Sequence, residues 1–290
     1  MSPALPDEYP VACEWLFPGE PAKAAKALAL VQAGEFGPDA LFVARDGAQV
    51  VGAVLVHLQC GSSGTVYPPG AINAATADAL GRTAVVRLAE ADVKQAQTLL
   101  RPAEAAKAEP LVRAGFVRIA RLSLQIRTIE LLEIVDPPTK SLRFTVATAQ
   151  TPGFAETLEA TYDGTLDCPE LNGLREIREV LKGYHQFPNG EAPGWFLVKE
   201  ANEPIGVVLL GPGPRDGIVE LSYLGLVPSA RGRRLGRELL RFALREAAHR
   251  FAECIILNVD ERNGPALQLY DKQDFRQYDQ QDVFLWTGPR

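Results

Sequence analysis

Residues 218–240 read Ile218-Val-Glu-Leu-Ser-Tyr-Leu-Gly-Leu-Val227, followed by Pro-Ser-Ala-Arg231-Gly-Arg-Arg-Leu-Gly236-Arg-Glu-Leu-Leu240. The first part predicts a buried strand, and the part after the arginine- and glycine-rich turn predicts an amphipathic helix. A helix N-terminus presents unpaired amides and the positive end of the helix dipole, and the arginines add positive charge. The stretch therefore indicates a site for a phosphate or pyrophosphate, with a solvated loop as the alternative.

Alternation along this strand predicts that Glu220 and Ser222 share one face, while Leu221 and Tyr223 share the other. A partly buried carboxylate beside a ligand loop is a candidate general base, because burial raises its pKa toward the working range. The alternative for Glu220 is a strand glutamate that only faces solvent.

A second motif follows the strand and helix: Asn263-Gly-Pro-Ala266-Leu-Gln-Leu-Tyr270-Asp-Lys-Gln-Asp274-Phe275. It predicts a short helix on which Ala266 and Tyr270 lie on one face, because they are four residues apart. Tyr270 is then either a core residue or a proton donor whose hydroxyl points at the ligand.

The composition bounds the class of protein. The chain has 290 residues, a net charge of −6 and a hydrophobic fraction of 47%, which is typical of a globular protein long enough for two domains. We expect no nucleic-acid partner, because that role needs a basic surface. We also expect no membrane contact and a cytoplasmic location, since no leader or membrane-spanning run is evident. The four scattered cysteines form no CxxC pair, and we expect no metal.

The predicted elements occur in the same order in both halves of the chain: helix, hairpin, strand, long helix, strand, short helix, strand. Gly115-Phe116 and Asp274-Phe275 occupy the same place in this order, and Asp136-Pro137-Pro138 predicts a linker. A repeat of about 140 residues is too long for a solenoid unit. It predicts two α+β domains, 1–135 and 136–290.

The strand, the turn and the second motif together resemble the GNAT superfamily of acyl-CoA-dependent N-acyltransferases, over roughly residues 141–290. The family has a strand, an Arg/Gln-x-x-Gly-x-Gly/Ala turn, and a later helix with the pattern Asn-x-x-Ala-x-x-x-Tyr-x-x-x-Gly-Phe. Two positions depart from it. Arg234 replaces the middle glycine of the turn, and Asp274 replaces the glycine before Phe275.

The resemblance implies two tandem domains of this fold, each with a mixed, mostly antiparallel sheet flanked by helices. It also implies an N-acetyltransferase that moves an acetyl group from acetyl-CoA to a primary amine by direct attack. Glu220 would act as general base, and Tyr270 as the general acid that protonates the departing CoA thiolate. The positions implied to contact acetyl-CoA are Leu224, Gly225, Leu226, Arg231, Gly232, Arg233, Arg234, Leu235, Gly236, Arg237 and Asn263. The alternatives are a non-catalytic acetyl-CoA sensor and an N-acyltransferase that uses a longer acyl chain.

The acceptor site is predicted in the segment before the turn, residues 162–172. Its candidate binding residues are Tyr162, Asp167, Glu170 and Asn172, of which the acids would favour a cationic amine. An exposed acidic loop is the alternative. The acceptor is expected to be a small-molecule or peptide amine, and the chain a monomer or a homodimer.

The first half resembles a degenerate copy of the same domain. Its counterpart of the turn, around Tyr67 to Asn73, has no arginine and no paired glycines, and no tyrosine precedes Gly115 at the expected place. Pro68 and Pro69 also predict that any strand there is short or at a sheet edge, because proline cannot donate to a ladder. We expect this half to be non-catalytic.

Overall fold

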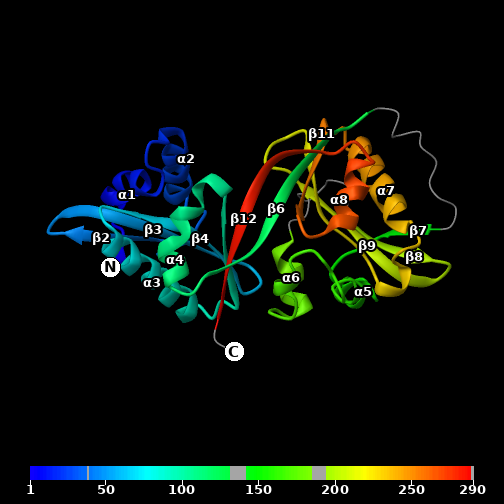
Figure 1. The fold of residues 1–290 in the computed structure, drawn as a ribbon, viewed down its shortest axis with the longest axis horizontal. Coiled ribbons are helices and arrows are strands. Elements are labelled where there is room, and N and C mark those ends of the chain that lie inside the picture. Colours follow the sequence, from blue (N-terminus) through cyan, green and yellow to red (C-terminus); the bar gives the residue numbers. More distant parts are fainter. Residues whose placement is uncertain (38, 131–141, 185–193, 289–290) are drawn as a thin grey trace. The chain divides into compact units, whose positions relative to one another are not determined.

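The structure is a computed structural model that describes residues 1–37, 39–130, 142–184 and 194–288 (Figure 1). It divides into two compact units: Met1–Ala120 with Gln281–Arg290, and Arg121–Gln280. The elements of the first unit are β1 (Ser2–Pro3), η1 (Pro6–Glu8), α1 (Tyr9–Leu16), α2 (Pro21–Gln32), β2 (Leu41–Asp46), β3 (Gln49–Gln59), β4 (Ser63–Ala71), α3 (Ala74–Glu90), β5 (Gln95–Leu100), η2 (Pro102–Ala108) and α4 (Glu109–Arg113).

The second unit begins within β6 (Val117–Thr128) and ends within β12 (Arg276–Thr287). Its other elements are β7 (Leu142–Val146), α5 (Phe154–Ala160), η4 (Pro169–Leu171), α6 (Ile177–Gly183), β8 (Trp195–Glu200), β9 (Glu203–Pro212), β10 (Ile218–Leu226), η5 (Pro228–Ala230), α7 (Leu235–His249), β11 (Cys254–Asp260) and α8 (Gly264–Asp271).

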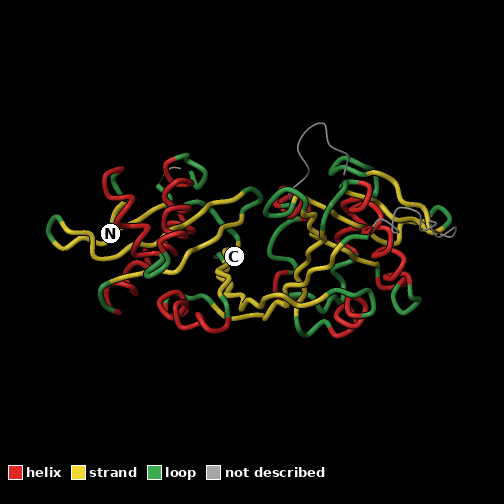
Figure 2. The backbone as a smooth tube through the Cα atoms, turned by 90° about the horizontal axis from the view of Figure 1, so that it is seen from above, coloured by secondary structure: helices red, strands yellow, loops and turns green. Residues whose placement is uncertain are grey.

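Each unit has one twisted sheet between helices (Figure 2). The strand order is β1-β2-β3-β4-β5-β12 in the first unit and β6-β11-β10-β9-β8-β7 in the second. All pairs within the units are antiparallel except β4–β5 and β10–β11, which are parallel. This confirms the predicted mixed architecture with mostly antiparallel sheets.

Strand β9 explains why helices cover both faces of the second sheet. Its residues are apolar at successive positions, as expected for a strand that is buried on both sides. Val208 and Leu210 pack in the cluster that contains the inner face of α7, whereas Val207 and Leu209 pack with α5 and α6. Figure 1 shows α7 and α8 on one side of this sheet and α5 and α6 on the other.

The last strand of each sheet differs from the sequence-based expectation. Residues 122–128 of β6 pair with β11 in the second unit, and residues 282–287 of β12 pair with β5 in the first. The core of the first unit accordingly contains Phe284 and Trp286 from the end of the chain. Domains 1–135 and 136–290 therefore do not coincide with the two compact units, and the predicted boundary itself lies outside the described residues.

Strand β4 is longer and more central than its prolines predicted. It pairs with β3 on one side and with β5 on the other. The ladder with β3 is interrupted by a register shift between Tyr67 and Gly70, where Pro68 and Pro69 lie, and the pairing with β5 ends at Thr65. The prolines are tolerated because they lie where the strand has no regular ladder to donate to.

In the described part of the chain, every helix is too short or too polar to cross a lipid bilayer.

Candidate functional site

The site begins where β10 separates from β11. The two strands pair from Ile218 with Cys254 to Glu220 with Ile256, and among the described strands none pairs with this edge of β10 beyond Glu220. The other edge of β10 stays paired with β9 as far as Leu226. One edge of the strand thus offers backbone N–H and C=O groups to a ligand.

A β-bulge at Ser222 accompanies this separation. Leu221 pairs with Leu210 and Tyr223 pairs with the next residue of β9, Leu209, so Ser222 is the extra residue of β10. A bulge bends its strand and reverses the alternation of side chains beyond it. Leu221 therefore packs with α7, while Tyr223 packs with α5 and α6. The prediction that these two residues share a face was wrong for this reason.

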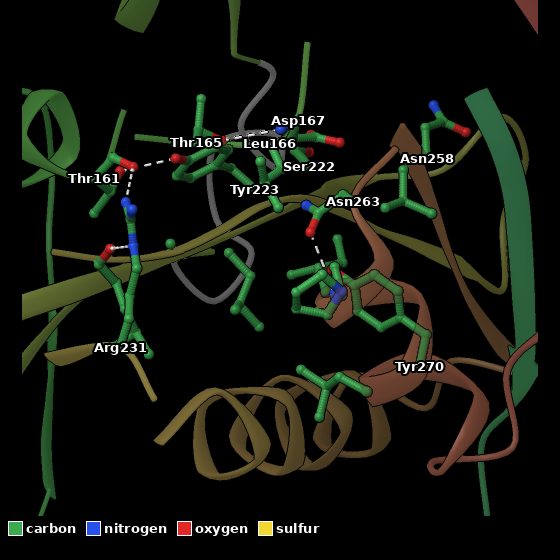
Figure 3. Close-up of a pocket in the computed structure, with 18 of the residues that line it drawn as sticks. Thr161, Thr165, Leu166, Asp167, Ser222, Tyr223, Arg231, Asn258, Asn263 and Tyr270 are labelled. Carbon is green, nitrogen blue, oxygen red and sulfur yellow. Dashed lines mark hydrogen bonds between the residues drawn. The ribbon is translucent and has the colours of Figure 1, made fainter. Parts of the chain in front are cut away.

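A pocket of about 240 Å³ occupies the opening between β10 and β11 (Figure 3). Strand β10 lines it from Leu221 to Leu226, the loop after α5 contributes Asp167, and α8 contributes Tyr270. Its other lining residues are Thr161, Gly164, Thr165, Leu166, Arg231, Asn258, Val259, Asn263, Pro265, Ala266 and Leu269.

A second cavity of about 890 Å³ continues from this pocket along the turn and the first residues of α7. The two share lining residues, among them Leu226, Asn263 and Ala266. The cationic residues that line the second cavity are Arg231, Arg234, Arg237 and Lys272, and Gly232, Leu235, Gly236 and Gln268 also lie along it. In the described structure no side chain caps the first turn of α7. A helix N-terminus without a side-chain cap and positive charge therefore meet there, an arrangement that suits a phosphate group.

Two arginines of the turn are engaged elsewhere. Arg231 lines both cavities, but its guanidinium donates to the carbonyl oxygens of Leu226 at 3.0 Å, Thr161 at 2.8 Å and Gly164 at 3.2 Å (Figure 3). Arg233 is absent from the lining of both cavities and pairs with Glu200 on β8 at 2.7 Å. Arg231 thus connects the turn to the loop after α5, and the side chains of Arg234 and Arg237 remain to face an anion.

Arg234 has a left-handed backbone with φ of 64°. Glycine takes this conformation freely, whereas a residue with a Cβ is strained by roughly 1–2 kcal/mol. The turn therefore keeps the backbone shape of a glycine while it presents a cation beside the N-terminus of α7.

Tyr270 is buried, with 8% of its surface exposed, and packs against Phe275 with ring centroids 5.5 Å apart. Among the described residues, its hydroxyl has no hydrogen-bond partner. Burial, and then the negative charge of Asp167, raise the pKa of Tyr270 above its ordinary value. The phenol is therefore protonated and available as a donor in the pocket.

Glu220 is not among the residues that line either cavity. It is the last residue of β10 that pairs with β11, one position before the pocket begins. The charge of Glu220 acts instead on Tyr278, whose pKa is raised by burial and then by Asp279 and Glu220. The predicted base and the predicted acid thus do not line one pocket.

Of the four predicted acceptor residues, Asp167 alone lines the pocket among the described residues. The hydroxyl of Tyr162 lies 3.3 Å from that of Tyr184, and the side-chain amide of Asn172 donates to the carbonyl of Tyr162 at 3.1 Å. Glu170 accepts two hydrogen bonds from Arg262, at 2.7 and 2.9 Å. These three residues stabilise the walls of the site rather than its interior.

Asp260 and Arg262, which were not among the predicted site residues, hold this side of the site together through hydrogen bonds. The side chain of Asp260 has no exposed surface, and it accepts hydrogen bonds from Arg262 and from the amide of Cys168. Burial alone would raise the pKa of Asp260, but the hydrogen bonds from Arg262 and Cys168 lower it below its usual value. The sequence could have indicated Asp260 and Arg262, because they lie between the end of a predicted strand and Asn263. Functional side chains are common at such places.

Asn263 lies at the N-terminus of α8, where its side-chain oxygen accepts from the amide of Ala266 at 3.3 Å. Its side chain lies between Asp167 and Tyr270 in Figure 3 and lines both cavities. Among the described residues, no group of three or more His, Cys, Asp or Glu side chains is arranged to hold a metal ion.

The part of the chain that forms this site is similar to known proteins. A sequence profile described as the Acetyltransferase (GNAT) family matches residues 158–275. A mycothiol acetyltransferase of Thermomonospora curvata is 35% identical over 100 residues, which are 34% of this chain and 33% of that protein. The match thus spans about a third of that relative's length. A peptidyl-lysine N-acetyltransferase of Escherichia coli, YjaB, is 31% identical over 114 residues, 39% of this chain and 67% of that protein.

The fold of the whole chain is similar to that of solved structures. A tandem GNAT protein from the clavulanic acid biosynthesis pathway aligns over 100% of this chain and 98% of its own, with a TM-score of 0.53 and 16% identity. This likeness supports two domains of the same fold in one chain.

Proposed function

Because the chain belongs to the acetyltransferase (GNAT) family, we propose that its second unit transfers an acetyl group from acetyl-CoA to a primary amine. One observation carries this proposal. Two cavities that share lining residues connect the open edge of β10 to the N-terminus of α7, which no side chain caps in the described structure. A thioester ligand with a long amide-containing arm and a pyrophosphate needs these two features in this order.

The residues of the site have separate roles in this proposal. Backbone groups of β10 from Leu224 to Leu226 bind the pantetheine arm and polarise the acetyl carbonyl. The amides at the start of α7, together with Arg234 and Arg237, bind the pyrophosphate. Asn263 lines both cavities and contacts the arm between them.

In the transfer, the amine nitrogen bonds to the acetyl carbon and the carbon–sulfur bond breaks. Tyr270 donates its proton to the leaving sulfur, and a base takes the proton that the amine loses. The amine attacks the thioester directly, so the protein mainly orients the two reactants. Glu220, the base predicted from the sequence, does not line the pocket, so it could take this proton only through a water molecule.

The experiment is an acceptor screen on the purified full chain. Acetyl-CoA is mixed with primary amines, including a lysine-containing peptide, an amino sugar and a polyamine, and the release of free thiol is measured. Thiol release that depends on one amine class supports the proposal. Binding of CoA by calorimetry without turnover on any amine would favour an acetyl-CoA sensor instead.

The same assay separates acyl chain lengths. Acetyl-, butyryl- and octanoyl-CoA are compared at equal concentrations with the best amine. We expect acetyl-CoA to react fastest, because the pocket at the opening of the strands has only about 240 Å³ for both the acyl group and the acceptor. A preference for octanoyl-CoA would reassign the donor.

A further inference from the structure

On the premise of this acetyl transfer, we propose that Asp167 binds the acceptor's ammonium group and takes its proton, and that Asp260 and Arg262 position it. Asp167 lines the same pocket as Tyr270 and the open edge of β10. Ser222, at the bulge where the strand opens, lines this pocket too, and Figure 3 labels both residues there.

The carboxylate of Asp167 is fixed at one oxygen. Its Oδ1 accepts a hydrogen bond of 2.7 Å from the backbone amide of Asp260. Among the described residues, Oδ2 has no hydrogen-bond donor. An ammonium group in the pocket would supply the missing donor and a compensating charge.

The environment of Asp167 also favours proton uptake. Burial raises the pKa of Asp167 and the charge of Asp260 adds to this effect, while the hydrogen bond from the Asp260 amide and the charge of Arg262 oppose it. The negative charge of Asp167 also raises the pKa of Tyr270. A carboxylate with a raised pKa is a better proton acceptor than an ordinary aspartate, and Asp167 lines the same pocket as the proposed acid.

The position of Asp167 depends on an ion network outside the pocket. Arg262 contacts the buried carboxylate of Asp260 at 2.6 Å and forms two hydrogen bonds with Glu170. Asp260 in turn accepts from the amide of Cys168 at 3.2 Å and donates its own amide to Asp167. Arg262 thus joins the loop that carries Asp167 to the end of β11.

The other end of the loop is held by Arg231, through the carbonyl oxygens of Thr161 and Gly164. A loop that is fastened at both ends by arginines keeps its carboxylate in one place before any ligand binds. This pre-organisation reduces the cost of ordering the acceptor site.

The proton balance of the step is complete. The ammonium group gives one proton to Asp167 and becomes a neutral amine, which forms the bond to the acetyl carbon. When the carbon–sulfur bond breaks, the sulfur takes the hydroxyl proton of Tyr270. The new amide nitrogen returns its surplus proton to Tyr270, and Asp167 releases its proton to solvent after the product leaves.

The test compares three matched acid-to-amide variants of the full chain. Asp167→Asn is expected to lower kcat/KM for the amine by about a hundredfold or more, since it removes a general base, while the KM for acetyl-CoA stays within a factor of two. Asp163→Asn is the control, because Asp163 is exposed on the same loop and does not line the pocket. If Glu220→Gln abolishes activity while Asp167→Asn retains it, the proposal is overturned.

Arg262→Gln tests the positioning role through the pH profile. The charged and titratable groups that interact with Asp167 are Asp260, Arg262, Cys168, Tyr184, Tyr223 and Tyr270. The charge of Arg262 lowers the pKa of Asp167, so without Arg262 the acid limb of kcat/KM should move to higher pH and activity should recover there. Asp167→Asn should stay inactive at every pH. A variant that only loses thermal stability, with an unmoved acid limb, would contradict the positioning role.

A binding measurement separates this proposal from the acetyl transfer itself. Calorimetry in the presence of CoA compares ethanolamine, lysine and spermidine with ethylene glycol, which lacks an ammonium group. Binding of an amine that Asp167→Asn abolishes, but without turnover, would remove the transfer and keep the ammonium site. If the wild-type protein neither binds nor acetylates any amine, both proposals fail.

Discussion

The two units contain the same strand–turn–helix and use it differently. Strand β4 pairs with β5 from Ser63 to Thr65 and then separates, just as β10 separates from β11 after Glu220. In the first unit two residues connect β4 to α3, and Asn73 caps the helix by accepting from the amide of Thr76. In the second unit eight residues, 227–234, precede α7, and within the described structure no side chain caps it.

Strands β4 and β10 also differ in the groups that lie against the edge from which the neighbouring strand has separated. In the first unit the buried hydroxyl of Thr98 donates to the carbonyl oxygen of Val66 at 2.7 Å. The corresponding part of β10 lines the pocket instead. In the first unit a protein hydroxyl thus occupies the opened edge and a side chain caps the helix, whereas in the second unit the opened edge lines a pocket and, in the described structure, no side chain caps α7.

The short helices allow a residue-by-residue comparison. The amide of Phe116 donates to the carbonyl of Leu111 at 3.0 Å, and the amide of Phe275 donates to that of Tyr270 at 3.1 Å. Leu111 is thus the counterpart of Tyr270, and it is fully buried. The first unit has a hydrocarbon where the second has a phenol, which is consistent with the prediction that the first half is non-catalytic.

The largest expected effect comes from making the second unit resemble the first at this position. Tyr270→Leu and Tyr270→Phe should each lower kcat by about a hundredfold or more, because both remove the proton donor. The fold should persist, and circular dichroism together with CoA binding checks this. Full kcat in both variants would show that Tyr270 is not the acid.

Glycines at matching places in β4 and β10 should respond differently to alanine. A Cβ on Gly70 would lie 1.7 Å from the carbonyl oxygen of Trp15, whereas one on Gly225 would lie 2.6 Å from Cε1 of Tyr223 and 2.8 Å from Thr161. Overpacking costs about 1–3 kcal/mol, and we expect Gly70→Ala to be the more destabilising change because backbone yields less than side chains. Urea denaturation measures both, and an equal loss would show that the backbone of α1 adjusts easily.

The turn should determine donor affinity in one unit only. Arg237→Ala should raise the KM for acetyl-CoA by about tenfold with little change in kcat, because it removes a cation beside the helix N-terminus. Asn73→Ala should leave that KM unchanged and cost about 1 kcal/mol of stability through the lost cap. Calorimetry should find one CoA bound per chain; two would contradict the assignment of the first unit.

The pH profile offers a smaller effect. A general acid must be protonated, and the pKa of Tyr270 is raised, so its proton is retained above the range in which an ordinary tyrosine ionises, near pH 10. We therefore expect kcat to show no loss attributable to Tyr270 up to about pH 10. Circular dichroism at each pH controls for unfolding, and a decline well below this range in folded protein would contradict the raised pKa.

The smallest expected effect concerns the residue before Phe275. Asp274 has φ of 60°, and its counterpart Gly115 has φ of 109°. Asp274→Gly should relieve the strain of a left-handed non-glycine residue and stabilise the protein by at most about 1 kcal/mol, since glycine also loses more entropy on folding. Thermal unfolding and kcat are the measurements, and a changed kcat would show an unexpected role for Asp274.

Much of the site could be predicted from local patterns. The turn and Tyr270 were found because each belongs to a motif with fixed spacing on one element, and local geometry determines where such residues point. Glu220 and the pair Leu221 and Tyr223 were placed by strict alternation along a strand. The bulge at Ser222 breaks that alternation, and it forms through pairing with β9, which the strand's own residues do not encode.

The predicted acceptor segment, residues 162–172, also shows what local patterns fail to predict. Asp167 was a candidate because it is an acid in the loop before the turn, and so were Tyr162, Glu170 and Asn172. Their different roles depend on hydrogen bonds to residues that are remote in the chain. Asp167 bonds Asp260, which is 93 positions away, and Glu170 bonds Arg262, which is 92 positions away. Such long-range ion pairs depend on how the chain folds back on itself, so no local pattern reveals them.

The sequence by itself determined the class of fold, the duplicated order of elements, the GNAT turn and helix, and which half carries them. These depend on hydrophobic periodicity and motif spacing, which act over a few residues. Only the tertiary structure decided that β6 and β12 complete the sheets of opposite halves, and that Asp167 rather than Glu220 lines the pocket with Tyr270. Strand pairing and buried charge networks are chosen by the energy of the whole fold, because each contact joins residues that are remote in the chain.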